Sequence, residues 1–371
     1  MQRFLFILLF LFFIVSACDD DIKTLANTPE SEYIDNGVLC DPLLSDFSPG
    51  ADDSWPACAS ADTGIYERFS QSISTIARVA SFETIATLLF DPTKEPSSDD
   101  FTEARLEYQI DEGLDSRVTR RYDPHFIVPQ DTNCGSEGTP ELYPDYCVGP
   151  SHLQPLLLDA LNAGIAGQDP RQNAARVEAG LLWFLYVSPF KESLTCTDKA
   201  ADCDSSFAYF TGAENYCAPD DTSCTSSNLD ERSDNARGFA RYVQSLNQDT
   251  YNRAWNGLLA VHCWRENDNV DGVATDITRR DLARTQYDRA LLRGVVDVLK
   301  HRVDLFLSAT GNEKLYYWSF IQTLGPVLYP AAQNRSEFNY QILKTELDKT
   351  SPDTVDVAAL TDALDNFIAC P

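Results

Sequence analysis

The sequence predicts an all-α fold, arranged as one large multi-helix bundle or as two packed bundles. Apolar residues recur at intervals of three and four along most of the chain, which is the periodicity of helices that bury one face. No segment shows the strict alternation of a half-buried strand, and no repeat of solenoid length is present. A hydrophobic content of 43% and an aromatic content of 11% are typical of a globule with a sizeable core.

The predicted helices follow one another along the chain. The segment 171–188 is almost wholly apolar from Ala179 to Val187, so we expect it at the centre of the bundle, with Pro189 ending or kinking it. The segment 278–308 is the longest, at about 45 Å for an α-helix. The other expected helices cover 65–89, the surroundings of Leu106 and Ile110, 153–167, 234–246, 249–266, 312–331, 336–349 and 357–368.

Two segments interrupt the helical domain, which we expect to span residues 63–371. Residues 124–150 contain five prolines and two cysteines, and residues 196–230 contain four cysteines among many Asp and Ser. Neither segment has a sustained helical periodicity. Both are therefore predicted as irregular loops that disulfide bonds staple to the helical body.

The first residues of the chain have the order of an export signal. Arg3 supplies a positive charge, residues 4–15 are apolar, and Ser16 and Ala17 are the small residues that precede a cleavage site. The apolar run is shorter than the roughly 20 residues that cross a bilayer as a helix. The pattern therefore predicts a signal peptide in preference to a permanent membrane helix.

The run Val15-Ser16-Ala17-Cys18 resembles the lipobox of bacterial lipoprotein precursors. The resemblance implies that residues 1–17 are removed as a signal peptide and that lipid is attached to the Cys18 thiol. It further implies an exported protein that is anchored to a bacterial membrane and faces the periplasm or lies on the cell surface. The alternative is an ordinary secretory signal in which Cys18 is incidental.

Residues 18–62, which follow the signal peptide, are rich in Asp, Ser, Pro and Gly and lack periodicity, so we expect a lipidated cysteine and a flexible acidic tether. The whole chain carries a formal net charge of −28. An acidic surface repels the phosphates of nucleic acid, so nucleic acid is not expected as a partner. The expected partners are the membrane, reached through the N-terminal lipid, and a protein or small molecule that the sequence does not identify.

Ten cysteines remain after Cys18, and an even number in an exported chain predicts disulfide bonds. A zinc cluster is disfavoured because the chain has no Cys-x-x-Cys pair. Proximity in the sequence favours bridges within the irregular segments, and elimination then pairs the last two cysteines. The predicted bridges are Cys40–Cys58, Cys134–Cys147, Cys196–Cys203, Cys217–Cys224 and Cys263–Cys370.

A polar loop between two predicted helices resembles an EF-hand calcium loop. Asn267, Asn269 and Asp271 hold the first, third and fifth positions, and a glycine holds the sixth. The twelfth position is Thr278, where the family has a bidentate Glu. Calcium is the cofactor that this resemblance implies. The alternative is an Asx-rich turn in which Asp276 or Thr278 caps the next helix.

Four polar residues in predicted helices are candidates for a shared pocket. Glu178 is the only acid in the apolar helix, where a buried carboxylate requires a partner such as an arginine. His301 and Asp304 share a helix face, and the pair is similar to the His-x-x-Glu motif of imelysin-type helical envelope proteins, with Asp in place of Glu. His262 is the remaining candidate. The alternative to a pocket is a set of separate structural ion pairs.

The leading hypothesis for function is a membrane-anchored envelope lipoprotein that binds a ligand or partner without catalysing a reaction. The first alternative is the metal-associated or peptidase-type envelope protein that the imelysin resemblance implies. The second is a hydrolase without a recognisable motif. The chain lacks a Gly-x-Ser-x-Gly elbow, a P-loop and a dinucleotide-binding fingerprint.

Overall fold

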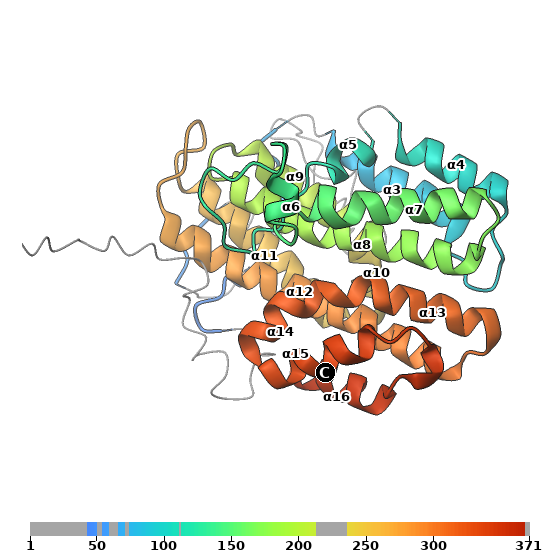
Figure 1. The fold of residues 1–371 in the computed structure, drawn as a ribbon. Coiled ribbons are helices and arrows are strands. Elements are labelled where there is room, and N and C mark those ends of the chain that lie inside the picture. Colours follow the sequence, from blue (N-terminus) through green and yellow to red (C-terminus); the bar gives the residue numbers. More distant parts are fainter. Residues whose placement is uncertain are drawn as a thin grey trace, which may run out of the picture.

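The computed structural model describes residues 43–49, 54–58, 66–70, 74–110, 113–212 and 236–367. These residues form a helical bundle without a strand, which confirms the all-α prediction (Figure 1). Within the described ranges one continuous hydrophobic core joins the helices from the first to the last, which favours one large bundle over two. None of these helices combines the length and the hydropathy that a transmembrane helix needs.

The helices agree closely with the predicted positions over most of the chain. A π-helical turn (Gly149–Leu153) leads into α7, and a 3-10 turn (Gly325–Leu328) separates α13 from α14. The α-helices are α3 (Thr75–Leu89), α4 (Ser98–Tyr108), α5 (Asp115–Val118), α6 (Thr139–Leu142), α7 (Gln154–Ile165), α8 (Pro170–Thr195), α9 (Ala201–Thr211), α10 (Gly238–Leu246), α11 (Gln248–Glu266), α12 (Ile277–Ser308), α13 (Gly311–Leu324), α14 (Tyr329–Arg335), α15 (Glu337–Leu347) and α16 (Val357–Phe367).

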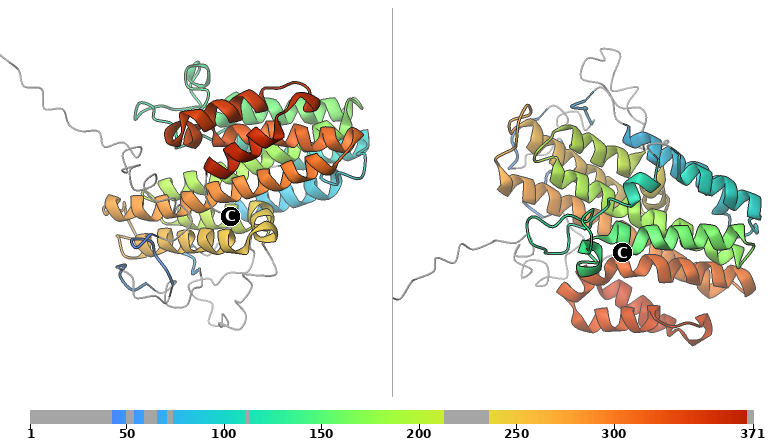
Figure 2. Two further views of the ribbon diagram at one scale, coloured as in Figure 1. Left: turned by 90° about the horizontal axis from the view of Figure 1, so that it is seen from below. Right: turned by 45° about the horizontal axis from the view of Figure 1, so that its top comes forward.

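Helix α8 lies at the centre of the bundle, as its apolar sequence predicted. It packs against α7, α9, α12 and α13, and almost all of its side chains from Val177 to Phe190 are buried. The helix does not end at Pro189 but continues to Thr195. The carbonyl of Pro189 accepts a hydrogen bond of 2.7 Å from the Ser206 hydroxyl of α9. The C-terminal helices α14, α15 and α16 lie together on one flank (Figure 2).

The prediction of an irregular loop over 196–230 is wrong for residues 201–211, which form α9. Phe207 and Phe210 of α9 are buried in the core, and this burial stabilises a helix whose Asp and Ser content obscured its periodicity. The Cys196–Cys203 bridge joins the end of α8 to α9, as predicted. The residues of the predicted Cys217–Cys224 bridge lie outside the described ranges.

The helix predicted over 65–89 begins only at Thr75. The buried carboxylate of Asp204 accepts hydrogen bonds from the backbone N–H groups of Phe69 (3.2 Å) and Ser70 (2.8 Å). It also accepts a hydrogen bond of 3.1 Å from the Tyr66 hydroxyl. Because a side chain far away in the sequence binds these donors, residues 66–70 follow an irregular path along α9 in place of a helix.

The structure joins Cys58 to Cys263, with Cα atoms 5.5 Å apart. The predicted Cys40–Cys58 and Cys263–Cys370 bridges are therefore wrong, while Cys134–Cys147 is present as predicted. Proximity in the sequence failed here because the chain before Cys58 folds back onto the bundle. Cys18, Cys40 and Cys370 lie outside the described ranges.

Two segments of the predicted tether, 43–49 and 54–58, pack on α11 and α12. The backbone N–H of Phe47 donates a hydrogen bond of 2.9 Å to Gln286, and Asp46 forms an ion pair with Arg289. These contacts lead the chain along α12 toward α11, where Cys58 meets its partner. The prediction of a flexible tether over 18–62 is thus wrong for these two segments.

Candidate functional site

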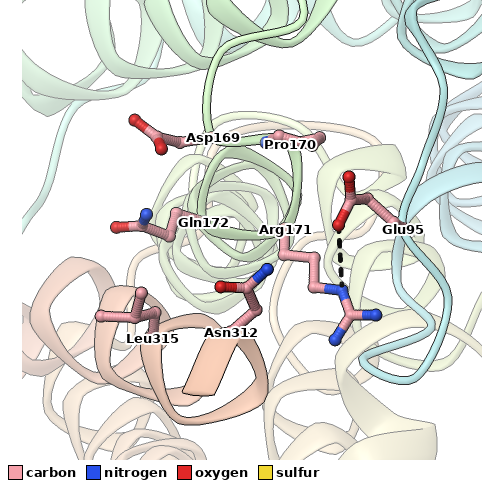
Figure 3. A pocket seen from close by; sticks show the side chains of 7 residues that line it. All are labelled: Glu95, Asp169, Pro170, Arg171, Gln172, Asn312 and Leu315. Atoms are coloured by element: carbon pink, nitrogen blue, oxygen red, sulfur yellow. Dashed lines mark ion pairs between the residues drawn. The ribbon is translucent and has the colours of Figure 1, made fainter.

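A surface cleft of about 120 Å³ opens where α8 and α13 begin, beside the loop that precedes α4 (Figure 3). Its walls carry charged, amide and apolar side chains from three separate parts of the chain. None of these residues was singled out from the sequence, because no local motif joins them. The lining residues are Glu95, Asp169, Pro170, Arg171, Gln172, Asn312 and Leu315.

Two tight turns place the walls of the cleft. Asp169 begins α8 with φ of 38°, a left-handed conformation that is uncommon for a residue other than glycine. Pro170 follows at the first helical position, where its fixed φ suits the start of a helix. Gly311 begins α13 with φ of 58°, which carries Asn312 and Leu315 onto the facing wall.

Arg171 and Glu95 of the cleft form an ion pair that is too long for a hydrogen bond, which we call an open ion pair. Arg171 Nε lies 3.8 Å from Glu95 Oε2, which is beyond hydrogen-bond distance, and Arg171 Nη2 donates to the Thr93 carbonyl at 3.2 Å (Figure 3). Arg171 Nε has no hydrogen-bond partner in the part of the chain that the structure describes. Because that nitrogen is buried, the capacity to bind a third group lies with Arg171 Nη1 and the Glu95 carboxylate, which make no hydrogen bond among the described residues.

A second polar cluster lies deeper between the same two helices. The buried Glu178 of α8 accepts hydrogen bonds from Arg302 (2.6 Å), from Tyr242 (2.6 Å) and from Tyr316 of α13. The Arg302 guanidinium also lies over the Phe320 ring, 4.5 Å from its centroid. Burial, followed by the charge of Glu178, raises the pKa of both tyrosines well above 10, so both hydroxyls stay protonated as donors. The partner that the sequence required for Glu178 is therefore Arg302.

The four candidates for a shared pocket do not meet. Gly257 of α11 approaches Tyr287 of α12 so closely that an added Cβ would lie 2.6 Å from the Tyr287 Cα atom, which fixes how the two helices pair. His262 lies beyond this crossing, toward the start of α12. His301 lies about 21 Å further along α12 in the opposite direction. The predicted constellation is therefore divided between two ends of the bundle.

The two histidines have different surroundings. His262 is buried against Phe69, with ring centroids 4.2 Å apart, and burial lowers its pKa to about 3. His301 and Asp304 are exposed, and partial burial and the neighbouring Arg302 lower the pKa of His301. Across the described ranges, no three His, Cys, Asp or Glu side chains gather in a geometry suited to a metal ion.

The calcium-like loop already surrounds a positively charged side chain, that of Arg265. The buried guanidinium of Arg265 donates to the carbonyls of Asp268, Asn269 (2.6 Å) and Gly272, and Arg265 Nε donates to the Cys196 carbonyl at 2.8 Å. The carbonyl oxygens on the inner side of this turn therefore face Arg265.

The predicted calcium ligands are also directed elsewhere. The side-chain amides of Asn267 and Asn269 donate to the carbonyls of Cys263 and Val273, both at 3.0 Å. Asp271 is exposed. Asp276 caps α12 by accepting a hydrogen bond from the Arg279 N–H at 2.9 Å, so the loop matches the Asx-rich turn that was the alternative to calcium.

Arg265→Lys is expected to lower the free energy of unfolding by about 2–3 kcal/mol, because one ammonium cannot replace a fork of donors to several buried carbonyls. Millimolar calcium chloride is expected to leave the melting temperature of the wild-type protein unchanged. Thermal unfolding of both proteins, with calcium and with chelator, measures these effects. A calcium-dependent rise in the wild-type melting temperature would restore the calcium hypothesis.

His125 forms a site that sequence reasoning missed. Its Nδ1 lies 2.5 Å from Asp123 and its Nε2 lies 2.9 Å from Asp288 of α12, while its ring stacks on Phe190. Burial lowers the pKa of His125, but the carboxylates of Asp288 and Asp123 together raise it to about 10. Since both ring nitrogens are engaged, this imidazolium fastens the 123–125 turn to α12 and is not arranged to move a proton.

The His125 ion pairs are expected to make stability depend on pH. A histidine whose pKa rises from 6.5 in the unfolded chain to about 10 in the folded protein stabilises the fold fully below pH 6.5, and this contribution is lost as the pH rises toward 10. The free energy of unfolding of wild type, compared with His125→Asn, should fall by a few kcal/mol between pH 7 and 10, on the order of 1 kcal/mol per unit. Urea unfolding at each pH measures the free energy of unfolding. If this free energy depends on pH equally in the two proteins, the prediction is wrong.

The fold and the cleft define a disulfide-stapled all-α bundle with a small polar cleft on its surface. Searches against protein-family models, curated proteins and solved structures find no match to this chain.

Proposed function

We propose that this protein is a membrane-anchored envelope lipoprotein and that it acts as a non-enzymatic binding module for a small zwitterionic molecule. The cleft between the starts of α8 and α13 is the proposed binding site. The open ion pair between Arg171 and Glu95 is the observation that carries the proposal, because it offers both signs of charge at the mouth of one cavity.

The side chains of the cleft suit a ligand with a carboxylate and an ammonium group. Arg171 offers the planar donor set that binds carboxylates, and Glu95 and Asp169 offer acceptors for an ammonium group. In the described ranges the side-chain amides of Gln172 and Asn312 make no hydrogen bond, so both are available to a ligand. A volume of about 120 Å³ is well below that of drug-sized pockets, which favours a ligand the size of an amino acid.

The proposed location follows from the N-terminal sequence and is supported by the cysteines. Disulfide bonds persist in oxidising compartments outside the cytosol, and three of them occur in the described ranges. The lipobox resemblance at Cys18 adds the anchor. Mass spectrometry of the mature N-terminus tests this part, and an acylated Cys18 is expected in wild type. The lipoprotein proposal would be refuted if the Cys18→Ala chain were found in the membrane fraction with the mature mass of wild type.

Isothermal titration calorimetry with a panel of free amino acids and dipeptides tests the binding site. At least one compound is expected to bind wild type, and Arg171→Ala is expected to weaken its binding by about tenfold or more, because a charge-assisted hydrogen bond contributes about 1.5–3 kcal/mol. Arg176→Ala is the matched control, since Arg176 lies on the same helix but pairs with Asp159 of α7, outside the cleft. Equal losses in both variants would contradict the assignment.

A further inference from the structure

The turn between α11 and α12 and the first residues of α12 display apolar side chains to solvent. Val270, Val273, Ile277 and Leu282 have 39%, 56%, 40% and 44% of their surface exposed, although they fall within thirteen consecutive residues. We call these four residues the apolar tip. The turn lies at one end of the bundle (Figure 1).

The backbone beneath the apolar tip is held rigidly. Arg265 binds the carbonyls of the turn from the inside, as described above. The Asp268 carboxylate accepts hydrogen bonds from the backbone N–H groups of Thr275 (2.6 Å) and Asp276 (2.5 Å), which closes the turn onto the start of α12. The exposed apolar side chains are therefore presented by a fixed scaffold.

The N-terminal segment reaches the bundle at this same end. Cys58 is bonded to Cys263, the carbonyl of Ala57 accepts from Asn267 at 3.5 Å, and the Arg279 guanidinium lies over the Trp55 ring at 5.9 Å. The chain that comes from the N-terminus thus first contacts α12 at Gln286 and Arg289 and then reaches the apolar tip at residues 55–58. Trp55 adds a large, partly buried aromatic ring of the kind that favours a membrane interface.

We propose that the apolar tip inserts into the interface of the bilayer that holds the lipid anchor, so that this end of the bundle docks on the membrane. The proposal rests on the anchoring proposed above. Twenty-four residues, 19–42, separate Cys18 from residue 43, where the described chain begins. The sequence of this segment predicts a flexible tether, and such a tether of that length would span roughly 25–30 Å on average, which would keep this end of the bundle close to the lipid surface.

The charges around the apolar tip oppose docking only weakly, because most of them are paired. Arg280 lies 2.8 Å from Asp281, and Arg279 lies 3.4 Å from Asp276. Asp268 is engaged by the backbone, which leaves Asp271 as the carboxylate of the turn without an ion pair or hydrogen bond among the described residues. Burial of apolar surface is therefore the expected source of affinity, and a neutral bilayer should suffice.

Sedimentation with phosphatidylcholine vesicles tests the proposal on the mature chain, residues 18–371, carrying Cys18→Ser so that no lipid contributes. The chain is expected to partition onto the vesicles, with little change on adding salt. Val270→Ser/Val273→Ser/Ile277→Ser should lower the partition coefficient by about tenfold or more. The control Leu106→Ser/Ile127→Ser/Leu142→Ser changes side chains that are 67%, 65% and 68% exposed elsewhere, and should leave it unchanged.

The outcomes separate this inference from the anchoring on which it rests. Absence of vesicle binding by the Cys18→Ser chain, or equal binding by both triple variants, overturns docking by the apolar tip even if Cys18 proves to be acylated in cells. Loss confined to the tip variant supports docking even if Cys18 proves to be unmodified. Melting temperatures equal to that of the unsubstituted chain confirm that both variants are folded.

Discussion

Removing the Cys58–Cys263 bridge by the double substitution Cys58→Ser/Cys263→Ser is expected to lower the free energy of unfolding by about 5 kcal/mol. The two cysteines are 205 residues apart, so the bridge removes a large amount of conformational entropy from the unfolded chain. It also fixes the segment around Trp55 and Phe47, whose rings pack edge to face against each other. Urea unfolding under non-reducing conditions measures the loss.

The Cys134–Cys147 bridge provides a matched control for this prediction. Its cysteines are only 13 residues apart, so the same entropic argument gives a loss of about 3 kcal/mol for Cys134→Ser/Cys147→Ser. Equal losses for the two double variants would show that loop length does not control the effect. Peptide mapping without reductant checks the pairing itself, since a Cys58 peptide linked to anything except the Cys263 peptide would refute it.

Arg302→Met is expected to lower the free energy of unfolding by about 3–5 kcal/mol, because it leaves the carboxylate of Glu178 buried without its cation. Tyr242 and Tyr316 would still donate hydrogen bonds, but neither carries a compensating charge. Chemical denaturation of the variant and of wild type at the same pH measures the difference.

Two further variants separate charge burial from lost packing. The double substitution Glu178→Gln/Arg302→Met removes both charges and keeps an acceptor for the tyrosines, so it should recover most of the stability that Arg302→Met loses. Arg176→Met breaks the surface pair with Asp159 and should cost less than about 1 kcal/mol. If the double variant is no more stable than Arg302→Met, the uncompensated charge is not the cause.

The helices could be predicted from the sequence because their main determinants are local. A helix forms its hydrogen bonds within itself, and its apolar stripe repeats over neighbouring turns, so α7, α11 and α12 were located to within a few residues, as was the start of α8. The burial of α8 also followed from its composition. The short α9 was missed, because the burial of Phe207 and Phe210 against distant helices stabilises it more than its own polar sequence does.

The candidate site was less accessible to sequence reasoning. The cleft joins Glu95, Arg171 and Asn312, which no spacing rule connects. Sequence reasoning recognised that Glu178 required a cation, but the choice of Arg302 depended on how α12 packs on α8. The EF-hand resemblance of residues 267–278 could not show that Arg265 of the preceding helix donates hydrogen bonds to carbonyls of this loop.

The sequence by itself determined the all-α class, the central place of α8 and the short-range Cys134–Cys147 and Cys196–Cys203 bridges. Each of these depends on residues within one helix or one loop, where chain connectivity keeps the interacting groups close. Only the tertiary structure decided the Cys58–Cys263 bridge and the pairing of Glu178 with Arg302. It also decided that residues 66–70 bind Asp204 and are not part of α3. These contacts join groups from 124 to 205 residues apart, and the packing of the core brings such groups together.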